Sequence, residues 1–432
     1  MRLAGRVAAA IEVLSEVLTR HRPASEALKD WGKAHRFAGS TDRHVIGTLV
    51  YDGLRQRNSA AWQAGGDTAR HIVLGVLRGG WGLSVADIAA LAQEQHGPSA
   101  LTSDEQQALS VLPSALPSHV AGNFPEWLAP EFEKLFGENA AAEGAALSRR
   151  APIDLRVNSL KADLPTVQKA LANFNPVPGP FVSSSLRITA PGPEEKHANV
   201  EVEAAHGMGW FEVQDTASQI AAALSGVKPG EDVADICAGA GGKTLALAAL
   251  MQNQGRLVAH DRDRHRLRPI FERISRAGAT CIDVLPADNG TALQNQKFDC
   301  VVIDAPCSGS GAWRRKPETK WKLTPKTLEQ RLKDQQDVLQ KGSALVKQGG
   351  RLVYITCSIL PQENTAQISA FLAANPDFKN IPTAVQWEKT IGDNVPVSAD
   401  GSNETLLLTP RQHDVDGFFV AVLERRRSSA TP

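Results

Sequence analysis

Apolar residues near the start of the chain recur at intervals of three and four positions. This spacing places them on one side of an amphipathic helix that buries a single stripe. The residues that follow it are Leu3, Val7, Ala10, Leu14 and Val17. The same pattern predicts helices over residues 25–31, 42–54 and 86–95, with no alternating strand pattern among them. We therefore predict an all-helical domain over residues 1–140.

The pattern changes in the middle of the chain, where apolar and polar residues begin to alternate. Residues 153–157 alternate as a strand does, and residues 164–174 return to helical spacing. The proline-bounded stretch 176–180 then interrupts the chain. We predict a small α+β subdomain over residues 141–212.

The last part of the chain alternates short apolar runs with helical patterns. The predicted strands cover residues 233–237, 256–260, 281–285, 301–303 and 352–356. The predicted helices cover residues 244–251, 264–277, 327–346 and 363–374. Such alternation indicates a doubly wound parallel sheet with helices on both faces. We predict an α/β, Rossmann-like domain over residues 213–432.

Composition restricts the class of protein further. Of 432 residues, 42% are apolar and 22% charged, which excludes collagenous, disordered and coiled-coil chains. Lys and Arg together number 47, as do Asp and Glu, so any site for a polyanion must be a local patch. The five cysteines form no C-x-x-C pair, which argues against zinc, and no apolar run approaches the ~20 residues of a membrane span. We expect a cytoplasmic monomer with no bound metal and no membrane segment.

A glycine-rich segment joins the first predicted strand of the α/β domain to its first helix. Residues 235–244 read Asp-Ile-Cys-Ala-Gly-Ala-Gly-Gly-Lys-Thr. A phosphate-binding P-loop requires glycine six positions before Lys243, but that position is Cys237, and the glycine spacing also fails the dinucleotide fingerprint. An NTPase is therefore disfavoured, and a cofactor without phosphates fits the loop best.

Carboxylates follow the next two predicted strands. Asp261 lies about twenty residues beyond the glycine loop, where an acidic side chain accepts hydrogen bonds from ribose hydroxyls. Asp288 follows the third strand, at a position over a purine ring. Ligands bind at the carboxyl ends of such strands, so the two residues together indicate an adenosine-bearing ligand. We predict S-adenosylmethionine as the cofactor.

Two cysteines end the fourth and fifth predicted strands. Cys307 lies in Asp-Ala-Pro-Cys-Ser and Cys357 in Thr-Cys-Ser. Carbon 5 of cytosine is too weakly nucleophilic to take a methyl group, but a thiolate that adds to carbon 6 activates it. Lys243 is the expected neighbour that favours the thiolate, and Asp304 is placed to orient the base. The residues alone do not show which cysteine attacks.

These segments resemble the RNA (cytosine-5) methyltransferases of the RsmB/Sun type, also called Fmu-like. The matching stretches are residues 156–160, 211–218, the glycine loop, both cysteine motifs and Asp416-Gly417-Phe418-Phe419. The resemblance covers about 150–425 and includes both cysteines, which makes it specific. A weaker one, over residues 40–55, likens the helical domain to the NusB-type domain of the bacterial branch and favours small-subunit (16S) rRNA as substrate.

The resemblance implies roles for individual residues. Cys357 becomes the nucleophile, and Cys307 the residue that assists release of the methylated base. The implied cofactor-binding residues are Cys237, Ala238, Gly239, Ala240, Gly241, Gly242, Lys243, Asp261, Asp288 and Asp304. Lys243 and Asp304 are also implied to be catalytic. One departure is Ala240, where the family usually has proline, so the loop is expected to be more flexible.

A cationic segment with two tryptophans follows the Cys307 motif. Cations contact phosphates, and aromatic faces stack on unpaired bases, so an RNA site is predicted here. With Arg156 and Asn158 of the first matching stretch, the predicted RNA-binding residues are Trp313, Arg314, Arg315, Lys316, Lys320 and Trp321. The six arginines between 262 and 276 either form a solvated face or contact RNA. The alternative function is a non-catalytic RNA-binding or ribosome-assembly factor that retains the fold.

Overall fold

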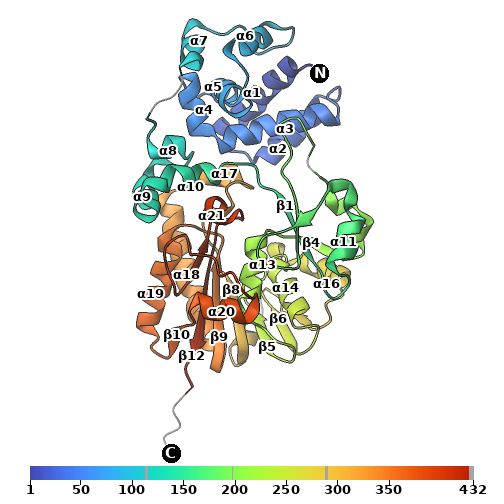
Figure 1. The fold of residues 1–432 in the computed structure, drawn as a ribbon, viewed down its shortest axis with the longest axis vertical. Coiled ribbons are helices and arrows are strands. Elements are labelled where there is room, and N and C mark those ends of the chain that lie inside the picture. Colours follow the sequence, from blue (N-terminus) through green and yellow to red (C-terminus); the bar gives the residue numbers. More distant parts are fainter. Residues whose placement is uncertain (112–114, 197, 288–289, 428–432) are drawn as a thin grey trace, which may run out of the picture. The chain divides into compact units, whose positions relative to one another are not determined.

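The computed structural model describes residues 1–111, 115–196, 198–287 and 290–427, and these form two compact units. Unit 1 comprises residues 1–150, 190–197 and 313–322. Unit 2 comprises residues 151–189, 198–312 and 323–432. Two short segments from later in the sequence lie with the first 150 residues (Figure 1). No helix among the described residues is long and apolar enough to cross a membrane.

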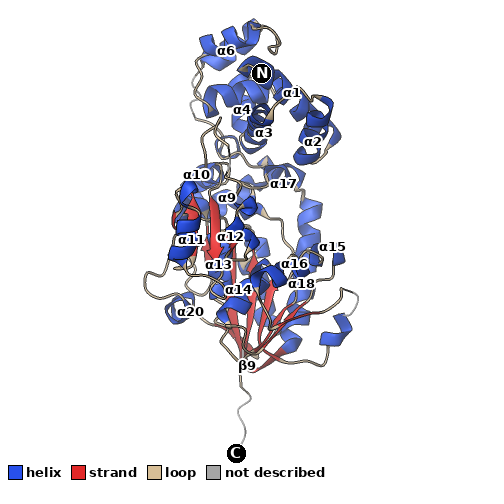
Figure 2. Cartoon of the chain, turned by 90° about the vertical axis from the view of Figure 1, so that its right-hand side faces the viewer, coloured by secondary structure: helices blue, strands red, loops and turns tan. Residues whose placement is uncertain are grey.

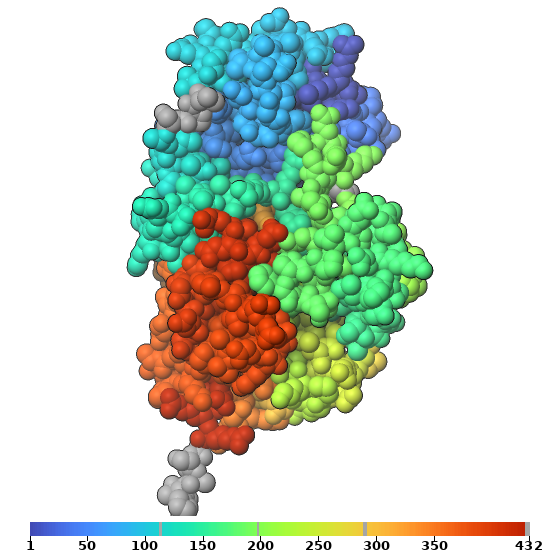
Figure 3. Space-filling model, in the orientation of Figure 1, coloured from blue at the N-terminus to red at the C-terminus, as the bar shows by residue number. Residues whose placement is uncertain are grey.

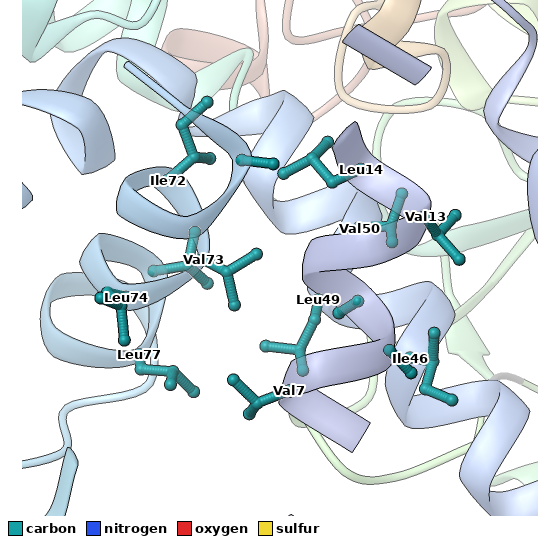
Figure 4. Close-up of a cluster of buried hydrophobic side chains, with 14 of the residues drawn as sticks. Val7, Val13, Leu14, Ile46, Leu49, Val50, Ile72, Val73, Leu74 and Leu77 are labelled. Atoms are coloured by element: carbon teal, nitrogen blue, oxygen red, sulfur yellow. The ribbon is translucent and has the colours of Figure 1, made fainter. Parts of the chain in front are cut away.

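Unit 1 is helical, as predicted for the N-terminal region. Its α-helices are α1 (Leu3–Arg20), α2 (Ala24–Ala34), α3 (Ser40–Arg55), α4 (Arg57–Ala64), α5 (Ala69–Gly75), α6 (Val85–Gln93), α7 (Ser103–Ser110), α8 (Ser118–Ala121), α9 (Ala129–Phe136), α10 (Ala140–Ala146) and α17 (Pro317–Lys322). The predicted stripe of α1 is buried from Val7 onward, with Leu3 partly buried, and it meets apolar side chains of α3 and α5 in the core (Figure 4). Val7 and Leu14 of α1, Leu49 of α3 and Ile72 of α5 have no exposed surface. Burial of such stripes provides the main free energy that holds these helices together.

The segment 313–322, which follows the Cys307 motif, packs within unit 1. Lys320 is fully buried, and its ammonium donates to the carbonyls of Arg55 and Asn123 and to Ser148 Oγ at 3.1, 2.7 and 2.9 Å. Trp321 donates its indole N–H to the carbonyl of Leu54 at 2.7 Å. The amino group thus meets three acceptors, while desolvation, with the charge of Arg55 adding to it, holds the pKa of Lys320 well below its usual value.

This packing corrects part of the predicted RNA site. Trp313, Arg314 and Lys320 are 1%, 3% and 0% exposed. Buried side chains cannot meet phosphates or stack on bases, so these residues have a structural role instead. Of the six predicted RNA-binding residues in this segment, Lys316 alone is classed as exposed, while Arg315 and Trp321 are half-buried.

A four-stranded antiparallel sheet forms the smaller part of unit 2. Its order is β2-β3-β1-β4, with β1 (Ile153–Val157), β2 (Val177–Pro178), β3 (Ser185–Ile188), β4 (Phe211–Val213) and the helices α11 (Leu164–Ala170) and α12 (Ala204–Gly207). Arg156 and Asn158 at the end of β1 are 5% and 2% exposed. Arg156 donates to Gln214 Oε1 at 2.7 Å, and Asn158 donates to the carbonyls of Gly209 and Ala277. The prediction that these two side chains bind RNA is therefore corrected as well.

The larger sheet of unit 2 has the order β10-β12-β9-β8-β5-β6-β7, with β11 paired to β12. Its strands are β5 (Asp232–Asp235), β6 (Arg256–Ala259), β7 (Ile282–Val284), β8 (Phe298–Asp304), β9 (Val346–Thr356), β10 (Phe378–Asn380), β11 (Leu406–Leu408) and β12 (Phe418–Arg425). The strands β7, β6, β5, β8 and β9 run parallel, as predicted. The antiparallel edge formed by β10, β11 and β12 was not predicted.

Helices cover both faces of this sheet (Figure 2). They are α13 (Thr216–Ala223), α14 (Gly242–Leu250), α15 (Arg264–Leu267), α16 (Ile270–Ala277), α18 (Pro325–Leu345), α19 (Thr365–Ala374), α20 (Thr383–Thr390) and α21 (Pro410–His413). Val302 and Val353 pack into a core with α13 and α14, whereas Ile303, which points to the other face, meets Gly342 of α18. The surface of unit 2 in Figure 3 is formed largely by the small-sheet segment in green and the C-terminal segment in orange to red. The predicted Rossmann-like fold is confirmed.

We expect Lys320→Met to destabilise unit 1. The substitution leaves two buried carbonyls and one hydroxyl without their donor, and an unsatisfied buried polar group costs about 1–3 kcal/mol. A decrease in the free energy of unfolding of about 3 kcal/mol should appear in urea denaturation of the full chain. The matched control is Lys322→Met, since Lys322 is exposed on the same helix. Equal stability of the two variants would contradict the structural role of Lys320.

Candidate active site

The strand order places two loops at the centre of the larger sheet. The chain passes from β5 to β6 and β7 on one side and returns to β8 and β9 on the other, so the order reverses between β5 and β8. Ligands of open α/β sheets bind at such a switch point, outside the carboxyl ends of the strands. The glycine loop leaves β5 here, and Asp304 ends β8.

The glycine loop has backbone angles that depend on glycine at two positions. Gly239 and Gly241 have φ angles of 51° and 86°, in the left-handed region. A Cβ atom at Gly241 would lie 2.5 Å from Ile270 Cγ1, so no larger residue fits there. The carbonyl of Ala240 accepts from Arg273 at 2.8 Å, and Glu212 binds the same guanidinium. The hydrogen bond from Arg273 thus holds the loop at Ala240, the position where the family usually has proline.

The predicted ribose-binding carboxylate is held against this loop. Asp261 is 2% exposed, and its two oxygens accept from the backbone N–H groups of Gly239 and Asp263 at 2.9 and 2.8 Å. A cavity of about 490 Å³ opens beside it. Its lining includes Ile236, Cys237, His260, Asp261, Arg262, Arg266, Leu293 and Pro306. Asp288, the second predicted carboxylate, lies outside the described residues.

Lys243, at the start of α14, forms an ion pair with Asp304 at the end of β8. The distance from Lys243 Nζ to Asp304 Oδ2 is 2.8 Å, and the lysine side chain is 7% exposed. The ammonium also lies 5.0 Å from the centre of the Phe418 ring, a cation–π contact. The structure therefore brings Lys243 and Asp304 together, an ion pair that the sequence analysis did not predict.

The two cysteines of the strand ends face each other. The Sγ atoms of Cys307 and Cys357 are 3.4 Å apart, within hydrogen-bonding range for thiols. The hydrogen bond from Cys307 lowers the pKa of Cys357, and the positive charge of Lys243 acts in the same direction against burial and Asp304. The pKa of Cys307 is raised well above its usual value, because it faces the sulfur of Cys357 and is buried. Cys357 is thus the better thiolate of the pair.

Glu363 connects the loops that carry these cysteines, and the sequence analysis missed it. It is fully buried, and its carboxylate accepts from the backbone N–H and hydroxyl of Ser308, from the hydroxyl of Ser358 and from Gln335 Nε2. Ser308 and Ser358 directly follow Cys307 and Cys357. A single carboxylate therefore fixes the chain just beyond each sulfur. The sequence shows only that Glu363 lies five residues after Ser358, just beyond Pro361, and this position alone does not indicate its role.

A second link joins the Cys307 loop to the C-terminal motif. Gly311 donates its N–H to the carbonyl of Cys357 at 3.0 Å, and Gly417 donates to the carbonyl of Gly311 at 2.9 Å. A Cβ atom at Gly311 would lie 2.0 Å from the carbonyl oxygen of Gly417, so the backbones touch. This contact explains why the Asp-Gly-Phe-Phe stretch, distant in sequence, belongs to the site.

Comparison with known proteins agrees with this geometry. A family model described as 16S rRNA methyltransferase RsmB/F matches residues 222–424, and one described as the ferredoxin-like domain of RsmF/B-like methyltransferases matches residues 124–194. A solved structure described as a methyltransferase homolog protein from Pyrococcus horikoshii has a TM-score of 0.60 at 28% identity, over 73% of this chain and 100% of that one. The fold and site define a Rossmann-like methyltransferase.

Curated relatives identify the family. The probable ribosomal RNA small subunit methyltransferase B of Synechocystis sp. is 33% identical over 307 residues, which cover 70% of this chain and 67% of that protein. Ribosomal RNA small subunit methyltransferase B of Vibrio vulnificus is 32% identical over 330 residues, covering 74% and 71%. The chain belongs to the RsmB/F family of 16S rRNA methyltransferases, so the family resemblance found in the sequence is confirmed.

Removal of the Cys307 thiol should make Cys357 less reactive at neutral pH. The hydrogen bond from Cys307 is the main influence that lowers the pKa of Cys357, so Cys307→Ala should raise that pKa and reduce the thiolate fraction at pH 7. The pH profile of Cys357 alkylation by iodoacetamide, read by mass spectrometry, should move to higher pH. Cys281→Ala, which alters a half-buried thiol elsewhere in the unit, should not move it. A midpoint that stays or falls in Cys307→Ala would contradict the assignment.

Glu363→Gln should loosen both cysteine loops. The amide retains one acceptor oxygen, but its NH₂ group faces the donors that the second carboxylate oxygen accepted from. The charge-assisted hydrogen bonds from the two serines, worth about 1.5–3 kcal/mol each, are then lost or weakened. We expect a decrease of about 3 kcal/mol in the free energy of unfolding. We also expect the pH profile of Cys357 alkylation to move to lower pH, because the charge of Glu363 raises the pKa of Cys357 and the amide removes it. Glu329→Gln, at an exposed ion pair with Lys333, is the control. Unchanged stability and alkylation in Glu363→Gln would exclude the clamp.

Proposed function

We propose that this chain transfers a methyl group from S-adenosylmethionine to carbon 5 of an unpaired cytosine in 16S rRNA, through a temporary bond between Cys357 and carbon 6. The observation that carries the proposal is the sulfur pair, 3.4 Å apart beside the ion pair of Lys243 and Asp304. Membership in an rRNA methyltransferase family supports the substrate class. A methyltransferase acting on oxygen or nitrogen has no need of two facing thiols.

The residues around the glycine loop fit the proposed cofactor. The loop lacks the phosphate-binding pattern, Asp261 offers acceptor oxygens at the cavity, and Ile236, Leu293 and Pro306 give it apolar walls. Cys237 to Lys243 and Asp261 would hold the cofactor, whose sulfonium supplies an electrophilic methyl group. The buried Asp235 links the two ends of the glycine loop, since at the end of β5 it accepts a hydrogen bond from Thr244 Oγ1 of α14 at 2.8 Å.

The chain's own residues account for activation of the base. The Cys357 thiolate adds to carbon 6, which moves an electron pair of the ring so that carbon 5 becomes nucleophilic. Asp304 accepts from the exocyclic amine and orients the ring, and Lys243 offsets the negative charge that accumulates as the thiolate adds. After carbon 5 has gained the methyl group it loses its proton to a base, and the bond from Cys357 to carbon 6 then breaks to restore the thiolate. We assign assistance in this release to Cys307.

The geometry of the site also constrains the RNA. A cytosine paired and stacked in a helix cannot reach sulfur atoms at the end of a sheet, so the target base must leave its stack. Of the predicted RNA-binding side chains, the exposed Lys316 stays a proposal for a phosphate contact. RNA contacts of Arg315 and Trp321, which are half-buried, also stay proposals.

The two cysteines should give opposite results with RNA that carries 5-fluorocytosine at the target. The wild-type protein should form a covalent adduct when S-adenosylmethionine is present. In 5-fluorocytosine, fluorine takes the place of the carbon 5 proton and cannot leave as a cation, so the elimination that releases Cys357 cannot occur. Cys357→Ala should form no adduct with this RNA. Cys307→Ala should form the adduct with this RNA and should also accumulate an adduct with unmodified RNA, because release is impaired. Denaturing gel electrophoresis of labelled RNA measures both. An adduct that depends on Cys307 and survives Cys357→Ala would reverse the assignment.

Absence of any adduct has a separate meaning. If the wild-type protein neither forms it nor binds S-adenosylmethionine at millimolar concentration in calorimetry, the non-catalytic RNA-binding alternative replaces the enzyme.

A further inference from the structure

A basic groove borders the cofactor cavity and takes no part in the proposed chemistry. Its volume is about 730 Å³, and Arg262, Arg264, His265, Arg268 and Phe271 line it. Arg262 lines both this groove and the cofactor cavity. We name these five residues the α15–α16 surface.

The charge of this surface is local, and the described residues compensate it only in part. Residues 262–268 contain four arginines and one aspartate in a chain whose formal net charge is zero. Asp263, the aspartate, is used as the N-cap of α15, where it accepts from the N–H groups of His265 and Arg266. Arg264 and Arg268 are exposed, and neither has an ion-pair partner in the described part of the chain. Two cations therefore remain available to a polyanion.

The backbone under this surface is fixed, so its cations are presented from one rigid face. Leu267 and Ile270 are 4% and 0% exposed and anchor α15 and α16 in a small core. Arg264 and Arg268 are four residues apart, a spacing that places both on the same side of a helical turn. Arg262 and Arg266 pair with Asp334 and Asp261, so the arginines alternate between structural and available roles.

An aromatic side chain lies beside these cations. Phe271 is 60% exposed, although a phenylalanine of this size is usually buried. It follows Arg268 by three residues and lines the same groove. A solvated charged face gains nothing from an exposed phenyl ring, whereas an unpaired base stacks on one.

We infer that the α15–α16 surface binds single-stranded or loop RNA at the border of the cofactor cavity, with Arg264 and Arg268 on phosphates and Phe271 stacked on a base. This inference rests on the proposed function, because it takes the same rRNA as ligand. Guanidinium groups bind phosphate oxygens in pairs of hydrogen bonds, and aromatic rings stack on bases regardless of sequence. The surface would therefore add affinity without selecting the target nucleotide.

Charge reversal tests the surface on the full chain. The variant Arg264→Glu/Arg268→Glu should bind unmodified, in vitro transcribed small-subunit rRNA at least tenfold more weakly at 0.15 M salt in filter binding. The slope of log K against log salt should decrease in magnitude by about 1.5, because two phosphate contacts are lost. Phe271→Ala should weaken binding about fivefold or more and leave that slope unchanged. Affinity for S-adenosylmethionine should stay at the wild-type value in both variants.

The matched control is Lys228→Glu/Lys389→Glu, which makes the same charge change at exposed positions elsewhere in unit 2. Equal losses in the control and in Arg264→Glu/Arg268→Glu, or no loss in either, would overturn the assignment of RNA to this surface. A loss seen with intact small subunits but not with free rRNA would overturn it in favour of a protein partner. If the wild type binds rRNA but forms no adduct with 5-fluorocytosine RNA, the proposed function fails while the binding result still decides the surface.

Discussion

The pairing of β8 with β9 is the constraint on which the contact between the two cysteines depends. The two strands run parallel, with Asp304 opposite Ile355, and the N–H of Ala305 continues the ladder to the carbonyl of Ile355. Cys307 and Cys357 lie three and two residues beyond this last pair, so both loops begin at the same level of the sheet. A shift of register would separate the sulfur atoms by at least one residue length, ~3.3 Å, and end their contact. The contact between the two thiols thus depends on the register of the sheet as well as on the conformation of the loops.

The Cys357 thiol lies near carboxylates, which by themselves oppose its ionisation. Asp304 and Glu363 raise the pKa of Cys357, as does burial, whereas the Cys307 hydrogen bond and Lys243 lower it. The pKa of Asp235, fully buried under the glycine loop, rises to about 7, mainly through desolvation and further through the charge of Asp304. Lys243 forms an ion pair with one of these carboxylates, so little positive charge remains for the sulfur. The second thiol then has a physical reason to exist, because a hydrogen bond favours the Cys357 thiolate without adding another charge to a crowded site.

Sequence patterns predicted the parallel part of the sheet well, because strands buried on both faces read as continuous apolar runs. They missed the antiparallel edge. The strands β10 and β11 have three residues each and carry too little periodicity to detect, whereas the start of the eight-residue β12 was noted only as a family-matching motif. The single helix predicted over residues 264–277 is divided at Pro269, where proline removes an N–H donor, into α15 and α16. Lys243, Asp261, Asp304, Cys307 and Cys357 could be proposed from the sequence because each lies at or just beyond the end of a strand or at the start of a helix. Glu363 was missed because its role depends on two loops that only the fold brings together.

The cationic residues show where composition misleads. The segment 313–322 looked like an RNA site because it concentrates cations and indoles, yet Lys320 lies between Trp313 and Trp321, 5.6 and 5.3 Å from their ring centres, and serves the core of unit 1. Lys and Arg carry long apolar stems and many donors, so they can satisfy buried carbonyls as readily as phosphates. Composition alone does not separate these uses. What distinguishes Arg264 and Arg268 from Lys320 is the absence, among the described residues, of an internal acceptor for their donors, and that difference becomes visible only in the folded chain.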